Sequence, residues 1–136
     1  MKRMKRVWIV DDDQEMAYAM SMMLEMLDCQ TTSFLHARSA VQTLEAGERP
    51  DMIVLDINMP EISGLDLLEF LRRRSEWKDL PVVMLSSEAA DVTVDEAMEL
   101  GADGYVMKPV TLEEMEEAIK SAFQKRKKRK KGNTVR

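Results

Sequence analysis

The chain alternates between two hydrophobic patterns. Short apolar runs rich in β-branched residues are separated by longer stretches in which apolar residues recur every three or four positions. The first pattern is typical of strands buried on both faces, and the second is typical of amphipathic helices. The predicted strands are Val7–Val10, Thr31–Leu35, Met52–Leu55, Val82–Leu85 and Tyr105–Met107.

A helix is predicted after each of these strands. Residues 38–47 and 88–100 carry a weak helical pattern, and the other three stretches carry a clear one. Strands that alternate with helices pair in parallel, because each helix returns the chain to the same edge of the sheet. The pattern therefore predicts an α/β fold with one five-stranded parallel sheet covered by helices on both faces. The expected core-facing residues of the clear helices are Met16, Met20, Met23, Leu24 and Leu27, then Leu65, Leu68 and Leu71, then Leu112, Met115, Ile119, Ala122 and Phe123.

Length and composition fit one globular domain: 136 residues, 45% of them hydrophobic and 33% charged. No apolar run approaches the roughly 18 residues that cross a bilayer. The start, MKRMKRVWIV, is not a signal peptide, because its apolar stretch ends after four residues at Asp11. The single cysteine, Cys29, fits a reducing compartment, so we expect a cytoplasmic protein in which Cys29 is a small buried hydrophobic residue.

The net charge of −5 conceals an uneven distribution. Residues 7–124 hold all 25 acidic residues but only 8 of the 20 basic ones, a formal charge of −17. Seven consecutive cations, KRKKRKK, occupy positions 125–131. We therefore expect an acidic body with a basic C-terminal tail, residues 125–136.

Polar residues gather where the predicted strands end. The first strand ends in Asp11-Asp12-Asp13, the third in Asp56, the fourth in Ser86-Ser87 and the fifth in Lys108-Pro109. Ligands of open α/β sheets bind beyond these carboxyl ends. Clustered carboxylates repel one another unless a cation joins them, and oxygen ligands with an open side suit Mg²⁺. A carboxylate nucleophile, a divalent metal, an ammonium group and a hydroxyl together predict an aspartyl-phosphate site.

Four motifs now make the sequence resemble the receiver domain of bacterial two-component response regulators. They are VDDD at 10–13, LDINMPEISG at 55–64, MLSS at 84–87 and GADGYVMKP at 101–109. The resemblance covers nearly all of residues 7–124 and implies a flavodoxin-like, doubly wound sheet with strand order 2-1-3-4-5. It implies a receiver domain over residues 1–124, and the absence of an output-domain signature after residue 124 suggests a stand-alone receiver. A piece of a longer regulator would have the same sequence.

The resemblance also implies a role for each motif residue. Asp56 is the expected phosphoacceptor, and Lys108 would contact the phosphoryl group, aimed by a cis bond to Pro109. Mg²⁺ would be bound by Asp56, by Asp12 directly, by Asp11 through water and by the backbone carbonyl of Asn58. Ser86 stands at the switch hydroxyl and Tyr105 at the switch aromatic, and Gly64 would allow the tight turn after the active-site loop.

Alternative interpretations remain for these residues. Asp11 and Asp12 could simply cap the first helix, and for Asp13 we favour capping or solvent exposure. Ser86 and Tyr105 could be ordinary strand-end residues, and Lys108 a solvated loop charge. His36 is expected to be a surface residue without a role as ligand or phosphoacceptor.

An enzyme of the haloacid-dehalogenase phosphatase type is the alternative function. It also uses an aspartyl phosphate and Mg²⁺, but it needs a second aspartate two residues after the nucleophile. Asn58 occupies that position, and an amide cannot shuttle protons. We therefore expect a phosphoacceptor switch that turns over no substrate.

Three surfaces are candidates for contact with partners. A stripe on the first helix, formed by Glu15, Ala19, Met22 and Met26, faces away from the core and is either a docking surface for the phosphodonor or a coincidental patch. The donor would be a histidine kinase or histidine phosphotransfer protein. The surface formed by the fourth helix, fifth strand and fifth helix would change for an output partner. The basic tail could be solvated, fold back on the acidic body, or reach an anionic partner.

Overall fold

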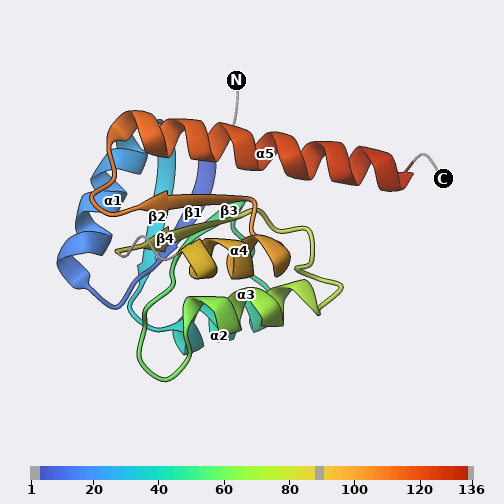
Figure 1. Cartoon of the computed structure of the whole chain (residues 1–136), viewed down its shortest axis with the longest axis horizontal. Coiled ribbons are helices and arrows are strands. Elements are labelled where there is room, and N and C mark those ends of the chain that lie inside the picture. Colours follow the sequence, from blue (N-terminus) through green and yellow to red (C-terminus); the bar gives the residue numbers. More distant parts are fainter. Residues whose placement is uncertain (1–3, 88–90, 135–136) are drawn as a thin grey trace.

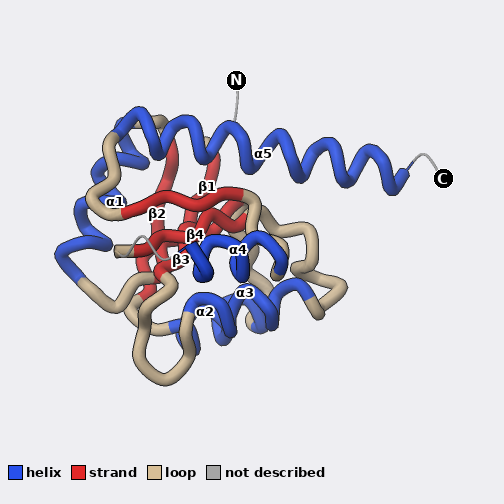
Figure 2. Tube along the Cα trace, viewed as in Figure 1, coloured by secondary structure: helices blue, strands red, loops and turns tan. Residues whose placement is uncertain are grey.

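A computed structural model describes residues 4–87 and 91–134, with side chains for residues 4–87 and 94–126. Five strands alternate with five helices along the chain (Figures 1 and 2). The strands are β1 (Lys5–Val10), β2 (Cys29–Phe34), β3 (Met52–Asp56), β4 (Val82–Ser86) and β5 (Gly104–Met107). The helices are α1 (Gln14–Met26), α2 (Ala37–Glu45), α3 (Gly64–Arg72), α4 (Asp91–Glu99) and α5 (Leu112–Thr134).

All strand pairs are parallel, and the sheet order is β2-β1-β3-β4-β5. This confirms the predicted flavodoxin-like α/β fold. Helices α1 and α5 cover one face of the sheet, and α2, α3 and α4 cover the other (Figure 1). No helix within the described residues is long and apolar enough to span a membrane.

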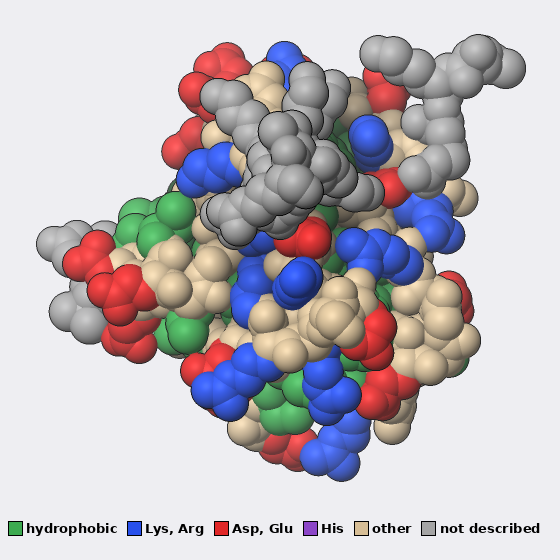
Figure 3. All heavy atoms as spheres, turned by 90° about the vertical axis from the view of Figure 1, so that its right-hand side faces the viewer, with side chains coloured by type: hydrophobic (Ala, Val, Ile, Leu, Met, Phe, Trp, Pro, Cys, Tyr) green, Lys and Arg blue, Asp and Glu red, His purple; other side chains and the backbone are tan. Residues whose placement is uncertain are grey.

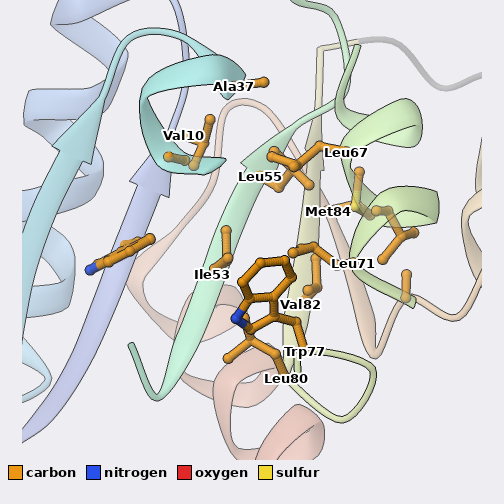
Figure 4. Close-up of a cluster of buried hydrophobic side chains, with 14 of the residues drawn as sticks. Val10, Ala37, Ile53, Leu55, Leu67, Leu71, Trp77, Leu80, Val82 and Met84 are labelled. Atoms are coloured by element: carbon orange, nitrogen blue, oxygen red, sulfur yellow. The ribbon is translucent and has the colours of Figure 1, made fainter. Parts of the chain in front are cut away.

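The position of the central strands, covered on both faces, explains why their sequences are apolar without interruption. In β3, Met52 and Val54 pack on the α1 and α5 side, while Ile53 and Leu55 pack on the side of α2, α3 and α4. Successive side chains of a strand point to opposite faces, and here both faces are covered. Figure 4 shows the second of these cores, in which the indole of Trp77 lies beside Leu80, Val82 and the β3 side chains.

The helices begin where their sequence provides capping groups. The Asp13 carboxylate accepts hydrogen bonds from the backbone N–H groups of Glu15 and Met16, which caps α1. Ser63 and Asp66 form a reciprocal capping box at the start of α3. Such caps satisfy backbone donors that the first helical turn leaves free. The preference for Asp13 as a capping residue is confirmed.

A cluster of buried charges lies at the end of the sheet opposite the carboxyl ends of the strands. Asp103, which precedes β5, is fully enclosed and accepts hydrogen bonds from Arg72 at 3.0 Å and from Arg126 at 2.6 Å. Its carboxylate also accepts from the backbone N–H of Val82 at 2.9 Å. The cluster therefore joins α3, α5 and the start of β4, and the sequence patterns did not predict it.

Helix α5 is longer than the sequence analysis expected. The basic run, predicted as a tail from residue 125, continues the helix to Thr134. Arg126 is only 6% exposed and belongs to the packed body. Lysine and arginine are good helix formers, so a run of them does not by itself end a helix.

Candidate functional site

Three aspartates converge at the carboxyl ends of β1 and β3. Asp11 and Asp12 follow β1 directly, Asp56 is the last residue of β3, and the two strands are neighbours in the sheet. One carboxylate oxygen from each of the three residues lies within 4.8 Å of the others. Asp11 and Asp56 are buried, whereas Asp12 is exposed. The cluster is therefore enclosed on the sheet side and open to solvent through Asp12.

Lys108 places an ammonium group between the two buried carboxylates. Its Nζ lies 3.2 Å from Oδ2 of Asp11 and 3.5 Å from Oδ1 of Asp56. The Lys108 backbone N–H donates to the carbonyl of Ser86 at 2.7 Å, which fixes the loop after β5 against the end of β4. The peptide bond between Lys108 and Pro109 is cis, as the resemblance implied. Lys108 is thus a partly enclosed member of the cluster and not a solvated loop charge.

Burial and repulsion shift the proton affinities of these groups. Burial, followed by the nearby Asp11 carboxylate, raises the pKa of Asp56 from 3.8 to about 6, although Lys108 opposes the rise. Burial lowers the pKa of Lys108, but Asp11 and Asp56 outweigh it and raise that pKa overall. One lysine therefore does not compensate the buried carboxylates fully, which is the electrostatic condition that favours a bound cation.

The donor set fits a hard divalent cation. Three carboxylates supply only oxygen, the ligand type of Mg²⁺ and Ca²⁺, and they leave an open side where water or phosphate oxygens can complete the coordination. Asp11 also accepts a hydrogen bond from the Asp13 backbone N–H at 2.9 Å, which fixes its carboxylate at the end of β1. Asp11 is therefore not the capping residue of α1, a role that Asp13 fills.

The loop after β3 is folded tightly against the strand that carries Asp56. The Gly64 backbone N–H donates to the carbonyl of Ile57 at 2.9 Å. A Cβ atom at Gly64 would lie 2.2 Å from the Asp56 carbonyl oxygen, which is closer than any real contact. Only glycine permits this close approach of the two backbone segments, so the predicted tight turn at Gly64 is confirmed. Asn58 lies in the same loop with its side chain exposed.

Ser86 and Tyr105 lie on the neighbouring strands β4 and β5. Ser86 ends β4 and is buried, and its register partner on β5 is Met107. Tyr105 pairs in register with Met84, two residues before Ser86, and packs against the core on the side of α2, α3 and α4. The buried Tyr105 hydroxyl has no hydrogen-bond partner among the residues that the structure describes.

The remaining sequence expectations can be placed on the same structure. His36 is exposed immediately before α2 and makes no side-chain capping bond. Cys29 is buried in the core beneath α1 and α5, as predicted. Met22 and Met26 of the α1 stripe are 53% and 69% exposed, and Tyr18 beside them is 58% exposed. Tyr18 lies three residues after Glu15 and four before Met22, so the same helical spacing could have included it in the stripe.

Comparison with known proteins adds a family to this geometry. Residues 7–120 match the family described as the response regulator receiver domain. The chain is 34% identical over 125 residues to the chemotaxis protein CheY-3 of Vibrio cholerae, a match that covers 91% of this chain and 95% of CheY-3. It is 35% identical over 105 residues to protein RcaC of Microchaete diplosiphon, covering 77% of this chain but only 16% of RcaC.

The same likeness extends to solved structures. The crystal structure of the chemotaxis response regulator CheY4 of Vibrio cholerae, crystallised at low pH, aligns with a TM-score of 0.81 and 26% sequence identity. The alignment covers 88% of this chain and 99% of CheY4. Both comparisons therefore find chemotaxis proteins of Vibrio cholerae among the proteins similar to this chain.

Proposed function

The chain belongs to the response regulator receiver family, and on that premise we propose that Asp56 accepts a phosphoryl group from a phosphohistidine. Receiver domains are regulatory phosphoacceptors and not turnover enzymes, and the family implies a histidine kinase as partner. The observation that carries the assignment to Asp56 is its position: a buried carboxylate at the end of β3, paired with Lys108 and grouped with Asp11 and Asp12.

In the proposed reaction a carboxylate oxygen of Asp56 attacks phosphorus, an O–P bond forms, and the N–P bond of the donor's phosphohistidine breaks. The imidazole leaves and takes a proton from its surroundings. Lys108 donates to the transferred phosphoryl oxygens and offsets the charge that develops on them. Asp11, Asp12, Asp56 and the backbone carbonyl of Asn58 would hold Mg²⁺, which supplies further charge neutralisation when bound.

Ser86 and Tyr105 are the proposed relay from the phosphorylated site. New phosphoryl oxygens would draw the Ser86 hydroxyl and Lys108 toward Asp56, which moves the end of β4. Tyr105 on the neighbouring strand β5 pairs in register with Met84, two residues before Ser86. Its ring would therefore move with the end of β4. The surface formed by α4, β5 and α5 then changes for an output partner. Phosphorylation in this scheme biases two conformations that already exist.

The phosphodonor would dock on the exposed face of α1. Met22, Met26 and Tyr18 form an apolar patch there, close in sequence to Asp12 and Asp13. Methionine adapts to irregular partner surfaces, and contiguous exposed apolar side chains mark interaction sites.

Acetyl phosphate labelling tests the phosphoacceptor assignment. With Mg²⁺ present, intact-mass analysis should show one added phosphoryl group, which disappears in Asp56→Asn and in the presence of a chelator. Asp28→Asn makes the same chemical change at an exposed aspartate and should keep the label. Labelling that survives Asp56→Asn would exclude Asp56, and continuous turnover of a generic phosphatase substrate would restore the phosphatase alternative.

A further inference from the structure

The edge strand β5 lies partly exposed between two helices. It is the last strand in the sheet order, with α4 packed on one face of the sheet and α5 on the other. In Figure 1, β5 is the orange strand between α5 and α4. A groove of about 460 Å³ lies over it and is lined by residues 103–107 and, from α5, by Glu114, Glu117, Ala118, Ser121 and Lys125. An exposed strand edge of this kind is a surface on which a partner segment can dock.

The floor of the groove is partly apolar. Tyr105 and Met107 on β5 and Ala118 on α5 line it, and each is partly exposed. On α4, Met98 is 41% exposed. The Tyr105 ring also packs against the core on the side of α4, so the groove includes the aromatic residue of the proposed relay. Apolar surface at the base of a groove gives a partner side chain a place to be buried.

The rim of the groove is acidic. The two glutamates in its lining, Glu114 and Glu117, are exposed, and so are Glu113 and Glu116 beside them. Helix α4 contains no lysine or arginine, and its exposed acidic side chains are Asp95, Glu96 and Glu99. Among the side chains that the structure describes, only Glu116 of these seven acids forms an ion pair, with Lys120 at 3.7 Å. The surface therefore carries negative charge that neighbouring cations do not neutralise.

Lys125, which also lines the groove, does not offset this charge. It lies eight residues after Glu117, about 12 Å along the helix at about 1.5 Å per residue. The Debye length at physiological ionic strength is about 8 Å, so exposed charges at that separation are largely screened from each other. Hydrogen bonds from the backbone and side chain of Thr111 lower the pKa of Glu114, which keeps this carboxylate ionised. The end of the groove near the start of α5 therefore attracts cations.

The hollow at the amino ends of the strands has a different character. It is lined by three cations and three acids, whose charges balance: Lys5, Arg49, Arg126, Asp51, Glu76 and Asp79. Figure 3 views the molecule from the side toward which α5 runs, and Lys and Arg side chains gather across the middle of that face. The uncompensated negative charge is thus a local property of the groove at β5, and not a uniform consequence of the acidic composition.

We propose that the groove over β5 docks a short basic segment of a partner protein. An apolar side chain of this segment covers Tyr105 and Met107. Its cations lie against Glu114 and Glu117. The inference rests on the proposed function, because it specifies the chemistry of the output partner that the surface of α4, β5 and α5 would meet. Complementary charge of this kind selects and orients a partner more than it adds affinity.

Other occupants match the groove less well. A metal ion needs ligand atoms that converge, and within the described part of the chain only Asp11, Asp12 and Asp56 converge in this way. Nucleic acids and anionic membranes would meet charge of their own sign. A second copy docked through the same surface would place acids against acids. The basic run of a second copy, residues 125–131, contains no apolar side chain to cover the floor.

Selection from a phage-displayed library of random dodecapeptides tests the proposal on the full chain. Enriched peptides should carry more Lys and Arg than Asp and Glu, and should contain an apolar residue. The affinity of a labelled synthetic peptide, measured by fluorescence anisotropy, should fall by about 2- to 30-fold in Glu114→Gln/Glu117→Gln, because two exposed ion pairs are lost. Glu114→Gln keeps an oxygen that accepts from Thr111, and circular dichroism verifies that the variant is folded.

A matched double variant separates a local site from net charge. Glu45→Gln/Glu48→Gln removes the same two charges from exposed side chains at the end of α2. It should change the affinity by less than about 1.5-fold, because screening limits distant charges. Equal effects of the two double variants, enriched peptides without an excess of cations, or a dimer in analytical ultracentrifugation that the peptide dissociates would each overturn the proposal.

The same samples distinguish this proposal from the proposed function. With Mg²⁺ and acetyl phosphate, the peptide affinity should change in the wild-type chain and stay constant in Asp56→Asn, while intact-mass analysis reports the label. An affinity that depends on Glu114 and Glu117 but does not respond to a confirmed label would support the docking site and contradict the relay through Tyr105. A missing label would contradict the phosphoacceptor assignment alone, since the comparison of the two double variants needs no phosphorylation.

Discussion

Replacing Asp56 by asparagine should stabilise the metal-free protein at neutral pH. Asp56 is buried beside Asp11, and its pKa rises from 3.8 to about 6 in the folded chain. The folded state therefore binds more protons than the unfolded state between these two values, and stability falls as the pH rises through them. At about 1.4 kcal/mol per pKa unit, ionising Asp56 costs the native state about 3 kcal/mol above pH 7.

Asparagine keeps the shape of the carboxyl group but cannot ionise, so the variant escapes this loss. Urea unfolding in a chelating buffer should give a free energy of unfolding that is higher by up to about 3 kcal/mol at pH 7.5, or roughly 10 °C in Tm. The difference should shrink as the pH falls below 6 and approach zero near pH 3, below both pKa values, where the wild-type carboxyl is protonated in both states.

The control is Asp28→Asn, which changes an exposed aspartate in the same way. It should alter stability by less than about 0.5 kcal/mol. A variant at Asp56 that is destabilised at pH 7.5, or whose gain does not depend on pH between 4 and 7.5, would refute the electrostatic reasoning.

Three further predictions concern the metal, the buried charge cluster and the turn. Mg²⁺ at about 100 times its dissociation constant should stabilise the fold by about 2.7 kcal/mol in thermal unfolding, and Asp12→Asn should abolish most of that gain; an unchanged gain would remove Asp12 from the site. Arg126→Ala should cost about 3–5 kcal/mol because it leaves Asp103 buried with one partner fewer, while the neighbouring exposed cation in Lys125→Ala should matter by less than about 0.5 kcal/mol. Equal effects of the two would contradict the structural role of Arg126. Gly64→Ala should destabilise by at least about 1 kcal/mol, since its Cβ would meet the Asp56 carbonyl oxygen; a neutral result in urea unfolding would show that the loop relaxes at little cost.

The parts of the fold that follow from local periodicity were accessible from the sequence. The runs that became β1, β3 and β4 are buried on both faces, so their apolar pattern is strong. β2 is an edge strand with several exposed residues, and it begins at Cys29, two residues before the predicted start. Its start depends on pairing with Lys5, which no local pattern records.

The candidate site was accessible for a different reason. Parallel strands bring their carboxyl ends to one edge, so Asp11, Asp56 and Lys108 could be grouped without knowledge of distances. Arg126 could not be distinguished within a run of seven cations. Its role depends on the rotational phase of α5 and on Asp103, a partner 23 residues away in sequence that meets it only in the folded chain.

The contact between Asp103 and Val82 gives β4 one fixed end and one responsive end. The Val82 N–H donates to the Asp103 carboxylate, which Arg72 and Arg126 also contact. At the other end of β4, Ser86 follows Leu85, which pairs in register with Asp56. A displacement that starts at Ser86 should therefore become smaller along the strand toward Val82. The Val82 amide should be the best protected of the strand, because it donates to the Asp103 carboxylate. We expect hydrogen exchange along β4 to slow progressively from Ser86 to Val82, and Val82 to exchange only when the whole domain opens.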